Sequence, residues 1–144
     1  MIGTQLHAKI IPSENLSVAS IRNILSEKYG TKIDEDNALV ISTGNGRVIL
    51  KVVQLKKIKI LRIYASFSKY DKATTQELII LANKWNDSKR FLRVSVDLED
   101  GSSTCDYYLV CVKGVDGDNL LESIEGFISL RNSWEEFVVS GGKE

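Results

Sequence analysis

The stretch from Thr74 to Val112 constrains the fold of this chain more than any other part of the sequence. Its first half repeats apolar side chains at spacings of three and four residues, which is typical of a helix lying on a hydrophobic layer. Thr74 and Glu77 have the spacing of a capping box, so we expect the helix to begin there, although a start at Asp71 fits nearly as well. The apolar stripe of this helix comprises Leu78, Leu81, Ala82 and Trp85.

A tight corner is predicted after this helix. The cluster Asn86-Asp87-Ser88 favours a turn, because short polar side chains bond to nearby backbone groups. Aromatic residues beside a turn are mostly structural, so we expect the two that flank this turn, Trp85 and Phe91, in the core. The residues expected to fix the helix-to-strand corner are Asn83, Asn86 and Arg90.

A first helix is predicted between Ser17 and Gly30. Ser17 can cap its start, and Gly30 can end it in the left-handed conformation that suits glycine. The segment before this helix, residues 1–13, is ambiguous. Apolar and polar residues alternate along it, as in an edge strand, while an unpaired tail fits nearly as well.

Five strands follow from apolar patterns and turn signals. Residues 38–42, 47–55 and 58–67 form the first three, and the first two are joined by Thr43-Gly44-Asn45-Gly46, a strong hairpin signal because asparagine and glycine tolerate positive φ. Residues 92–98 and 103–113 form a second hairpin around an Asp-Gly turn. A final helix then begins near residue 116 or 118 and ends before Gly141.

The element order is therefore α-β-β-β-α-β-β-α in a single domain over residues 1–144. Successive strands joined by short turns pair in antiparallel fashion. We expect an α+β domain, with helices packed on an antiparallel sheet of five strands, or six if residues 1–13 add one. A chain of 144 residues is long enough for one domain with a real hydrophobic core.

Composition and cysteine spacing indicate a cytoplasmic protein. Lysine plus arginine equals aspartate plus glutamate at 19 each, so no net charge attracts nucleic acid or membranes. Apolar runs fall far short of the roughly 20 residues that span a bilayer, and the N-terminus lacks the pattern of a signal peptide. Cys105 and Cys111 lie roughly 20 Å apart along one predicted strand, so we expect unpaired thiols in a reducing compartment.

Catalytic, cofactor and metal sites are not expected from the residue pattern. His7 is the single histidine, and it lacks nearby partners for acid–base or nucleophilic chemistry. The acidic residues around one turn lack the spacing of an EF-hand loop, so a solvated turn is expected in place of a calcium site. These residues are Asp97, Glu99, Asp100 and Asp106. We therefore expect a protein that is not an enzyme and that carries no cofactor and no metal.

Basic residues around one predicted hairpin form the only charge feature: Lys51, Lys56, Lys57, Lys59 and Arg62. Such a group could bind nucleic acid or an acidic partner. The interpretation we favour is a solvated hairpin whose lysines discourage edge-to-edge pairing, because the net charge is zero and no nucleic-acid motif accompanies it.

The corner and the elements after it carry a resemblance to a known family. The matching residues are Asn83, Trp85, Asn86, Arg90 and Phe91, followed by Asp97, Asp100, Gly101, Gly114, Phe127 and Phe137. On these residues the chain resembles the YbjN family, whose fold is similar to that of the type III secretion chaperones. The resemblance spans most of residues 17–139, within a core of residues 14–140. It implies a small cytosolic dimer that acts by binding other proteins in a regulatory or chaperone-like role, without catalytic residues or a cofactor.

Apolar residues exceed what one small sheet should hide. They lie on both faces of the last strand and late in the final helix, and the candidate interface residues are Tyr108, Val110, Trp134, Phe137 and Val138. Because exposed apolar patches usually mark interfaces, we expect a homodimer that covers them.

Three functions agree with these sequence features. The preferred one is a non-enzymatic protein-binding domain, chaperone-like or regulatory, that acts as a homodimer and offers an apolar groove to an unknown protein partner. The alternative is a small-molecule-binding regulatory domain with a pocket between helix and sheet. A basic-hairpin nucleic-acid binder is less favoured, and a membrane partner is not expected.

Overall fold

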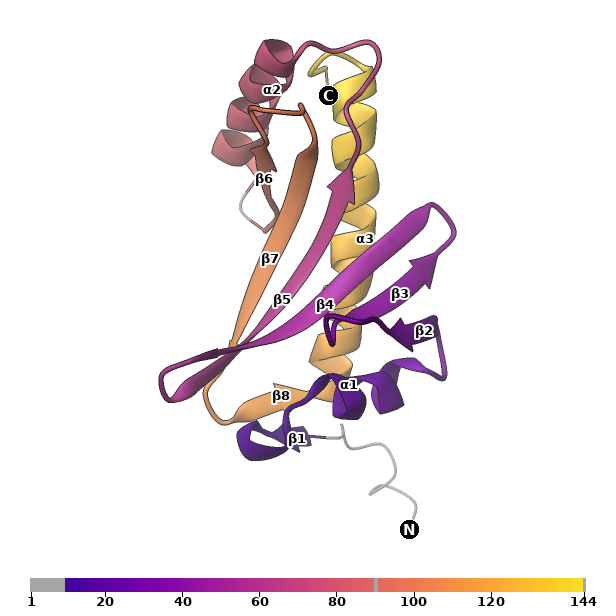
Figure 1. Cartoon of the computed structure of the whole chain (residues 1–144), viewed down its shortest axis with the longest axis vertical. Coiled ribbons are helices and arrows are strands. Elements are labelled where there is room, and N and C mark those ends of the chain that lie inside the picture. Colours follow the sequence, from indigo (N-terminus) through magenta and orange to yellow (C-terminus); the bar gives the residue numbers. More distant parts are fainter. Residues whose placement is uncertain (1–9, 90, 144) are drawn as a thin grey trace.

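The computed structural model describes residues 10–89 and 91–143, which form an α+β domain with helices packed on an antiparallel sheet (Figure 1). This confirms the predicted fold class. The predicted order of elements is present, with β1, β2 and β8 added. In chain order the elements are β1 (Ile10–Pro12), the short 3-10 helix η2 (Ser13–Asn15), α1 (Val18–Leu25), β2 (Gly30–Ile33), β3 (Leu39–Thr43), β4 (Gly46–Leu55), β5 (Ile58–Phe67), α2 (Thr75–Ser88), β6 (Arg93–Val96), β7 (Ser103–Cys111), β8 (Gly114–Asp116) and α3 (Gly117–Val139).

The main sheet has six strands in the order β2-β3-β4-β5-β7-β6, all antiparallel. Strand β7 pairs with β5 along its whole length. Strand β6, which precedes β7 in the chain, pairs on the other side with residues 103–106 alone. The second half of β7, residues 107–111, therefore lies at the margin of the sheet.

The sixth strand is not the one that the sequence suggested. Strand β2 supplies it by pairing with β3, whereas residues 10–12 form β1 and pair with β8 in a separate two-stranded sheet. Helix α1 also ends earlier than predicted, because Gly30 opens β2 and does not end the helix. The remainder of the ambiguous N-terminal segment, residues 1–9 with His7, lies outside the described residues.

Two predicted helix starts are confirmed by their capping boxes. The backbone N–H of Ser20 donates to Ser17 Oγ over 3.1 Å, and the backbone N–H of Ser17 donates to Ser20 Oγ over 2.9 Å. At α2, Glu77 N–H donates to Thr74 Oγ1 over 3.1 Å, and Thr74 N–H donates to Glu77 Oε2 over 2.8 Å. These bonds satisfy donors that the first turn of a helix cannot pair internally.

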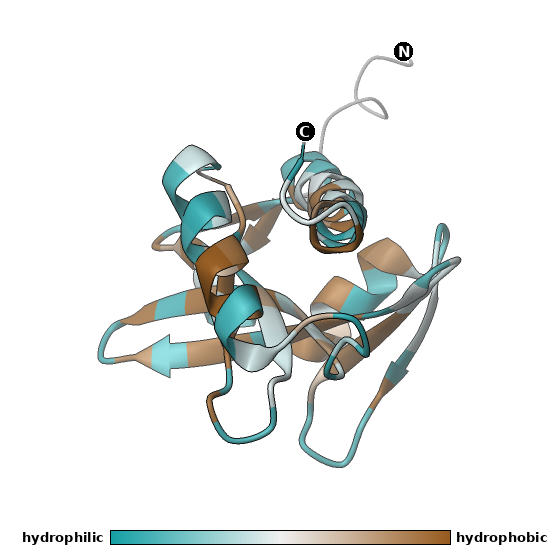
Figure 2. Ribbon diagram, turned by 90° about the horizontal axis from the view of Figure 1, so that it is seen from above, coloured by the Kyte–Doolittle hydropathy of each residue, from teal (hydrophilic) through white to brown (hydrophobic). Residues whose placement is uncertain are grey.

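The helices α1, α2 and α3 share one core with one face of the sheet, which we call the covered face (Figure 2). Side chains from β4 and β5 that point to this face, such as Leu50 and Ile63, are fully buried. None of the helices in residues 10–89 and 91–143 combines the length and apolar character that crossing a bilayer requires. The opposite face of the sheet, which we call the open face, has none of these three helices over it.

Burial overturns part of the predicted interface. Trp134, Phe137 and Val138 are 0%, 5% and 7% exposed, so they belong to the core of the chain itself. The physical reason is the course of α3, which brings its last turns against α2. The ring of Trp85 meets Trp134 edge-on at 5.7 Å between centroids, and Phe137 at 5.6 Å. Tyr108, the first of the five candidates, is instead 55% exposed.

Candidate functional site

The open face carries apolar side chains in rows that cross three strands. The register of the sheet places Val53, Ile60 and Val110 side by side on β4, β5 and β7. The neighbouring row contains Leu55 opposite Ile58, at the end of the β4–β5 hairpin. Val110 is 56% exposed and Leu55 is 50% exposed. We define the open-face patch by the residues Val53, Leu55, Ile58, Ile60, Tyr108 and Val110.

Arg62 lies next to this patch and is neutralised within the sheet. Its Nε donates a hydrogen bond to Oδ1 of Asp106 on β7, and this bond raises the pKa of Arg62 against the opposing effect of burial. The guanidinium carbon lies 4.0 Å from the centroid of the Tyr64 ring and 5.9 Å from that of Tyr108. This part of the open face therefore presents aromatic rings around an ion pair that is already formed.

The five basic residues that cluster in the sequence do not share one surface. Arg62 and Lys51 lie on the open face, where Lys51 Nζ is 5.9 Å from the Tyr64 ring. Lys59 points to the other side and donates from Nζ to the carbonyl of Leu16 over 3.1 Å. This division weakens the electrostatic field that a nucleic acid would meet on any single face.

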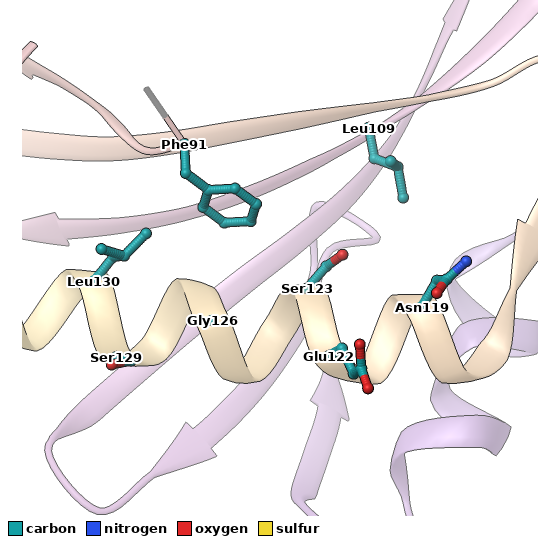
Figure 3. A pocket seen from close by; sticks show the side chains of 8 residues that line it. All are labelled: Phe91, Leu109, Asn119, Glu122, Ser123, Gly126, Ser129 and Leu130. Carbon is teal, nitrogen blue, oxygen red and sulfur yellow. The ribbon is translucent and has the colours of Figure 1, made fainter. Parts of the chain in front are cut away.

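A groove of about 630 Å³ runs between α3 and the margin of β7 (Figure 3). From the sheet side, Phe91 and Leu109 point toward the helix. From the helix side, Leu130 and Ser123 point back toward the sheet. Gly126 lies between these two helix residues, and a Cβ added to it would meet no atom within 4 Å. The glycine thus leaves open space at the middle of the groove.

The corner motif fixes the chain beside this groove. The indole Nε1 of Trp85 donates to the carbonyl of Leu92 over 3.1 Å. The side-chain amide of Asn86 donates to the carbonyl of Val94 and accepts from its N–H, each over 2.8 Å. Asn86 therefore bonds to the outer edge of β6 as a neighbouring strand would. Asn83 is exposed at the surface of α2.

Phe91 and Arg90 complete the corner motif. Phe91, expected in the core, is 38% exposed, and its ring stacks on Tyr107 with 4.2 Å between centroids. The chain leaves the corner toward the margin of the sheet, where α3 does not cover this ring fully. Arg90 lies outside the described residues.

The titratable groups do not converge on a reactive centre in the described part of the chain. Burial raises the pKa of Cys105 to about 12 and also raises the pKa of Cys111, so both thiols stay protonated. Carboxylate oxygens of Asp97 and Asp100 accept backbone N–H bonds of 2.8 Å within their own turn, while Asp106 bonds to Arg62 on the sheet. Over residues 10–89 and 91–143, no three His, Cys, Asp or Glu side chains gather as metal ligands would.

Sequence reasoning missed Arg131, which is 5% exposed on the covered face. Its Nη2 donates to the carbonyl of Asn45 over 3.0 Å, and its guanidinium carbon lies 4.7 Å from the centroid of the Phe67 ring. The sequence did indicate that this arginine is buried, because Arg131 lies between Phe127 and Trp134 in the apolar stripe of α3. Its role is structural, since it ties α3 to the β3–β4 turn.

Comparison with known protein families finds a match for most of this chain. Residues 17–138 match the model of the YbjN family, which carries the description "putative bacterial sensory transduction regulator". That description names a regulator and no enzymatic activity. A search of curated proteins gives no match to this chain.

Proposed function

Because the chain belongs to the YbjN family, we propose that it is a non-enzymatic regulatory domain that binds other proteins and forms a homodimer through the open face of its sheet. The observation that carries this proposal is the open-face patch, which spans three strands and has none of the described helices over it.

An antiparallel sheet face that remains in water normally shows polar side chains. Here the central row of Val53, Ile60 and Val110 is apolar on every strand. Contiguous apolar patches of this kind mark interfaces with other proteins.

A second copy of the chain suits this surface. In a two-fold dimer the same patch meets itself, so both surfaces are apolar. The ion pair between Arg62 and Asp106 neutralises two of the charges beside the patch, and Lys51 adds a positive charge in the same row.

The experiment is a mass measurement by light scattering at micromolar concentration. We expect twice the chain mass of 16.1 kDa. Leu55→Asp should shift the protein to the monomer mass, because it places a charge on a half-exposed position inside the patch. Ser66→Asp is the matched control, since Ser66 is exposed on β5 outside the patch, and this variant should remain dimeric. A monomer mass for the unmodified protein would reject the homodimer.

A further inference from the structure

Strand β7 is paired on both sides over only the first half of its length. Asp97 N–H donates to the carbonyl of Ser102 over 2.8 Å, which shows that Ser102 directs its backbone groups toward the β6 side. In an antiparallel ladder every second residue does the same, so the N–H and C=O groups of Tyr108 and Val110 also point to that side. No strand that the structure describes pairs with this side of residues 107–111. Figure 1 shows this half of β7 at the margin of the sheet.

The groove between α3 and β7 runs directly below this free edge (Figure 3). A strand added beside β7 would alternate its side chains between the two faces of the sheet. One set would enter the groove among Phe91, Leu109 and Leu130, above the open space at Gly126. The other set would lie on the open face, beside Tyr108 and Val110.

The groove also indicates the charge of its occupant. Glu122 lines it and forms no ion pair with any residue in the described part of the chain, whereas Glu125 on the same helix pairs with Lys28. A lysine or arginine in the occupant would complement Glu122. A second copy of β7 would not supply this cation, because its groove-side residues are Tyr107, Leu109 and Cys111.

We propose that the free edge of β7 binds an extended segment of a partner protein by strand addition, with apolar side chains in the groove and a basic side chain at Glu122. Main-chain hydrogen bonds supply affinity in this mode, and alternate side chains supply specificity. The inference rests on the proposed function only in taking a protein as the partner. Dimerisation through the open-face patch leaves the β7 edge available.

The geometry specifies a probe. An antiparallel strand beside β7 runs in the same direction as α3, so its N-terminal end meets Glu122 before it reaches Leu130. The probe is a fluorescent seven-residue peptide with threonine at odd positions, lysine at position two, and valine at positions four and six. Fluorescence anisotropy should show that it binds at least tenfold more tightly than the matched peptide with glutamate at position two.

Two variants at Gly126 distinguish an effect on peptide binding in the groove from an effect on folding. Gly126→Leu should weaken binding of the lysine peptide more than tenfold, because the leucine fills the open space. The same change should not impair folding, since leucine favours a helix more than glycine does. Gly126→Ala is the matched control, because its added Cβ meets no atom within 4 Å, and it should bind the peptide as the unmodified protein does.

Hydrogen bonding to the edge is tested separately. N-methylation of the threonines at positions three and five removes the N–H groups that would face β7, and should weaken binding more than tenfold. In hydrogen exchange, the peptide should slow the amides of Tyr108 and Val110. It should leave those of Tyr107 and Leu109 unchanged, because β5 already pairs with these two residues.

Three results would overturn the inference. The first is no binding of the lysine peptide, and the second is equal binding of the N-methylated one. The third is unchanged exchange of the Tyr108 and Val110 amides when the peptide is bound, which would place the peptide away from the edge of β7. A monomer that binds the peptide would reject the proposed homodimer while supporting strand addition.

Discussion

The two faces of the same strands meet different surroundings. On β7, Cys105 and Cys111 point to the covered face and are 0% and 1% exposed, while Tyr108 and Val110 point to the open face and are more than half exposed. Both faces are apolar at these positions, but α3 and its neighbours cover only one. The covered face is therefore satisfied within the chain. The open face is left with apolar area that none of the described helices covers.

The aromatic cluster between α2 and α3 shows how the helices bury apolar side chains on the covered side of the sheet. Trp85, Trp134 and Phe137 pack against one another, and all three are 5% exposed or less. Changes on this face should act on the stability of the fold, whereas changes on the open face should act on association.

Among the changes that leave the protein folded, the largest effect is expected for Trp85→Ala. The substitution removes a buried ring from the aromatic cluster and the hydrogen bond to Leu92, and should lower the free energy of unfolding by about 3–5 kcal/mol. Urea denaturation followed by circular dichroism measures this. Ile80→Ala on the same helix is the control, because Ile80 is 65% exposed and should change the free energy by about 0.5 kcal/mol or less. Equal losses for both variants would contradict the distinction between buried and exposed positions.

An intermediate effect is expected from alkaline pH. The Cys105 thiol ionises near 9.0 when unfolded, but burial raises its pKa to about 12 in the folded protein. The unfolded state therefore releases a proton first as pH rises, and the free energy of unfolding should fall from about pH 9 upward while staying constant, for this group, below it. Urea denaturation at several pH values between 8 and about 10 measures the slope of the free energy of unfolding against pH. Cys105→Ala should reduce that slope, and an unchanged slope would show that the thiol is not buried.

The smallest effect on stability is expected for Tyr108→Asp on the open face. This half-exposed position should cost about 0.5 kcal/mol or less, while light scattering should show loss of the dimer. The same substitution at Phe137 places a carboxylate in the core, so Phe137→Asp should abolish the folded circular dichroism spectrum. If Tyr108→Asp unfolds the protein instead, the open face is not a free surface.

The sequence predicted features that depend on a few neighbouring residues. The helix cap at Ser17, the capping box at Thr74 and the turn between Thr43 and Gly46 follow from local chemistry and are present in the structure. The burial of Trp85 also followed from the stripe of its own helix.

Features that depend on distant elements were not predictable in this way. The burial of Trp134 depends on the path of α3 past α2, and the exposure of Phe91 depends on where that helix stops covering the sheet. Leu98 continues the apolar alternation of β6, yet it is 74% exposed because the strand ends at Val96. Four residues were too few for periodicity to reveal β2.

The contact between Arg131 and the β3–β4 turn links two positions in the evolution of this fold. A Cβ at Gly46 would lie 2.6 Å from Nη2 of Arg131, and Gly46 has a φ of 141°, which disfavours any other residue. A lineage that acquires a side chain at position 46 must therefore move the guanidinium of Arg131 aside, or replace that arginine with a shorter residue. The two positions should covary across natural sequences, although they are 85 residues apart in the chain.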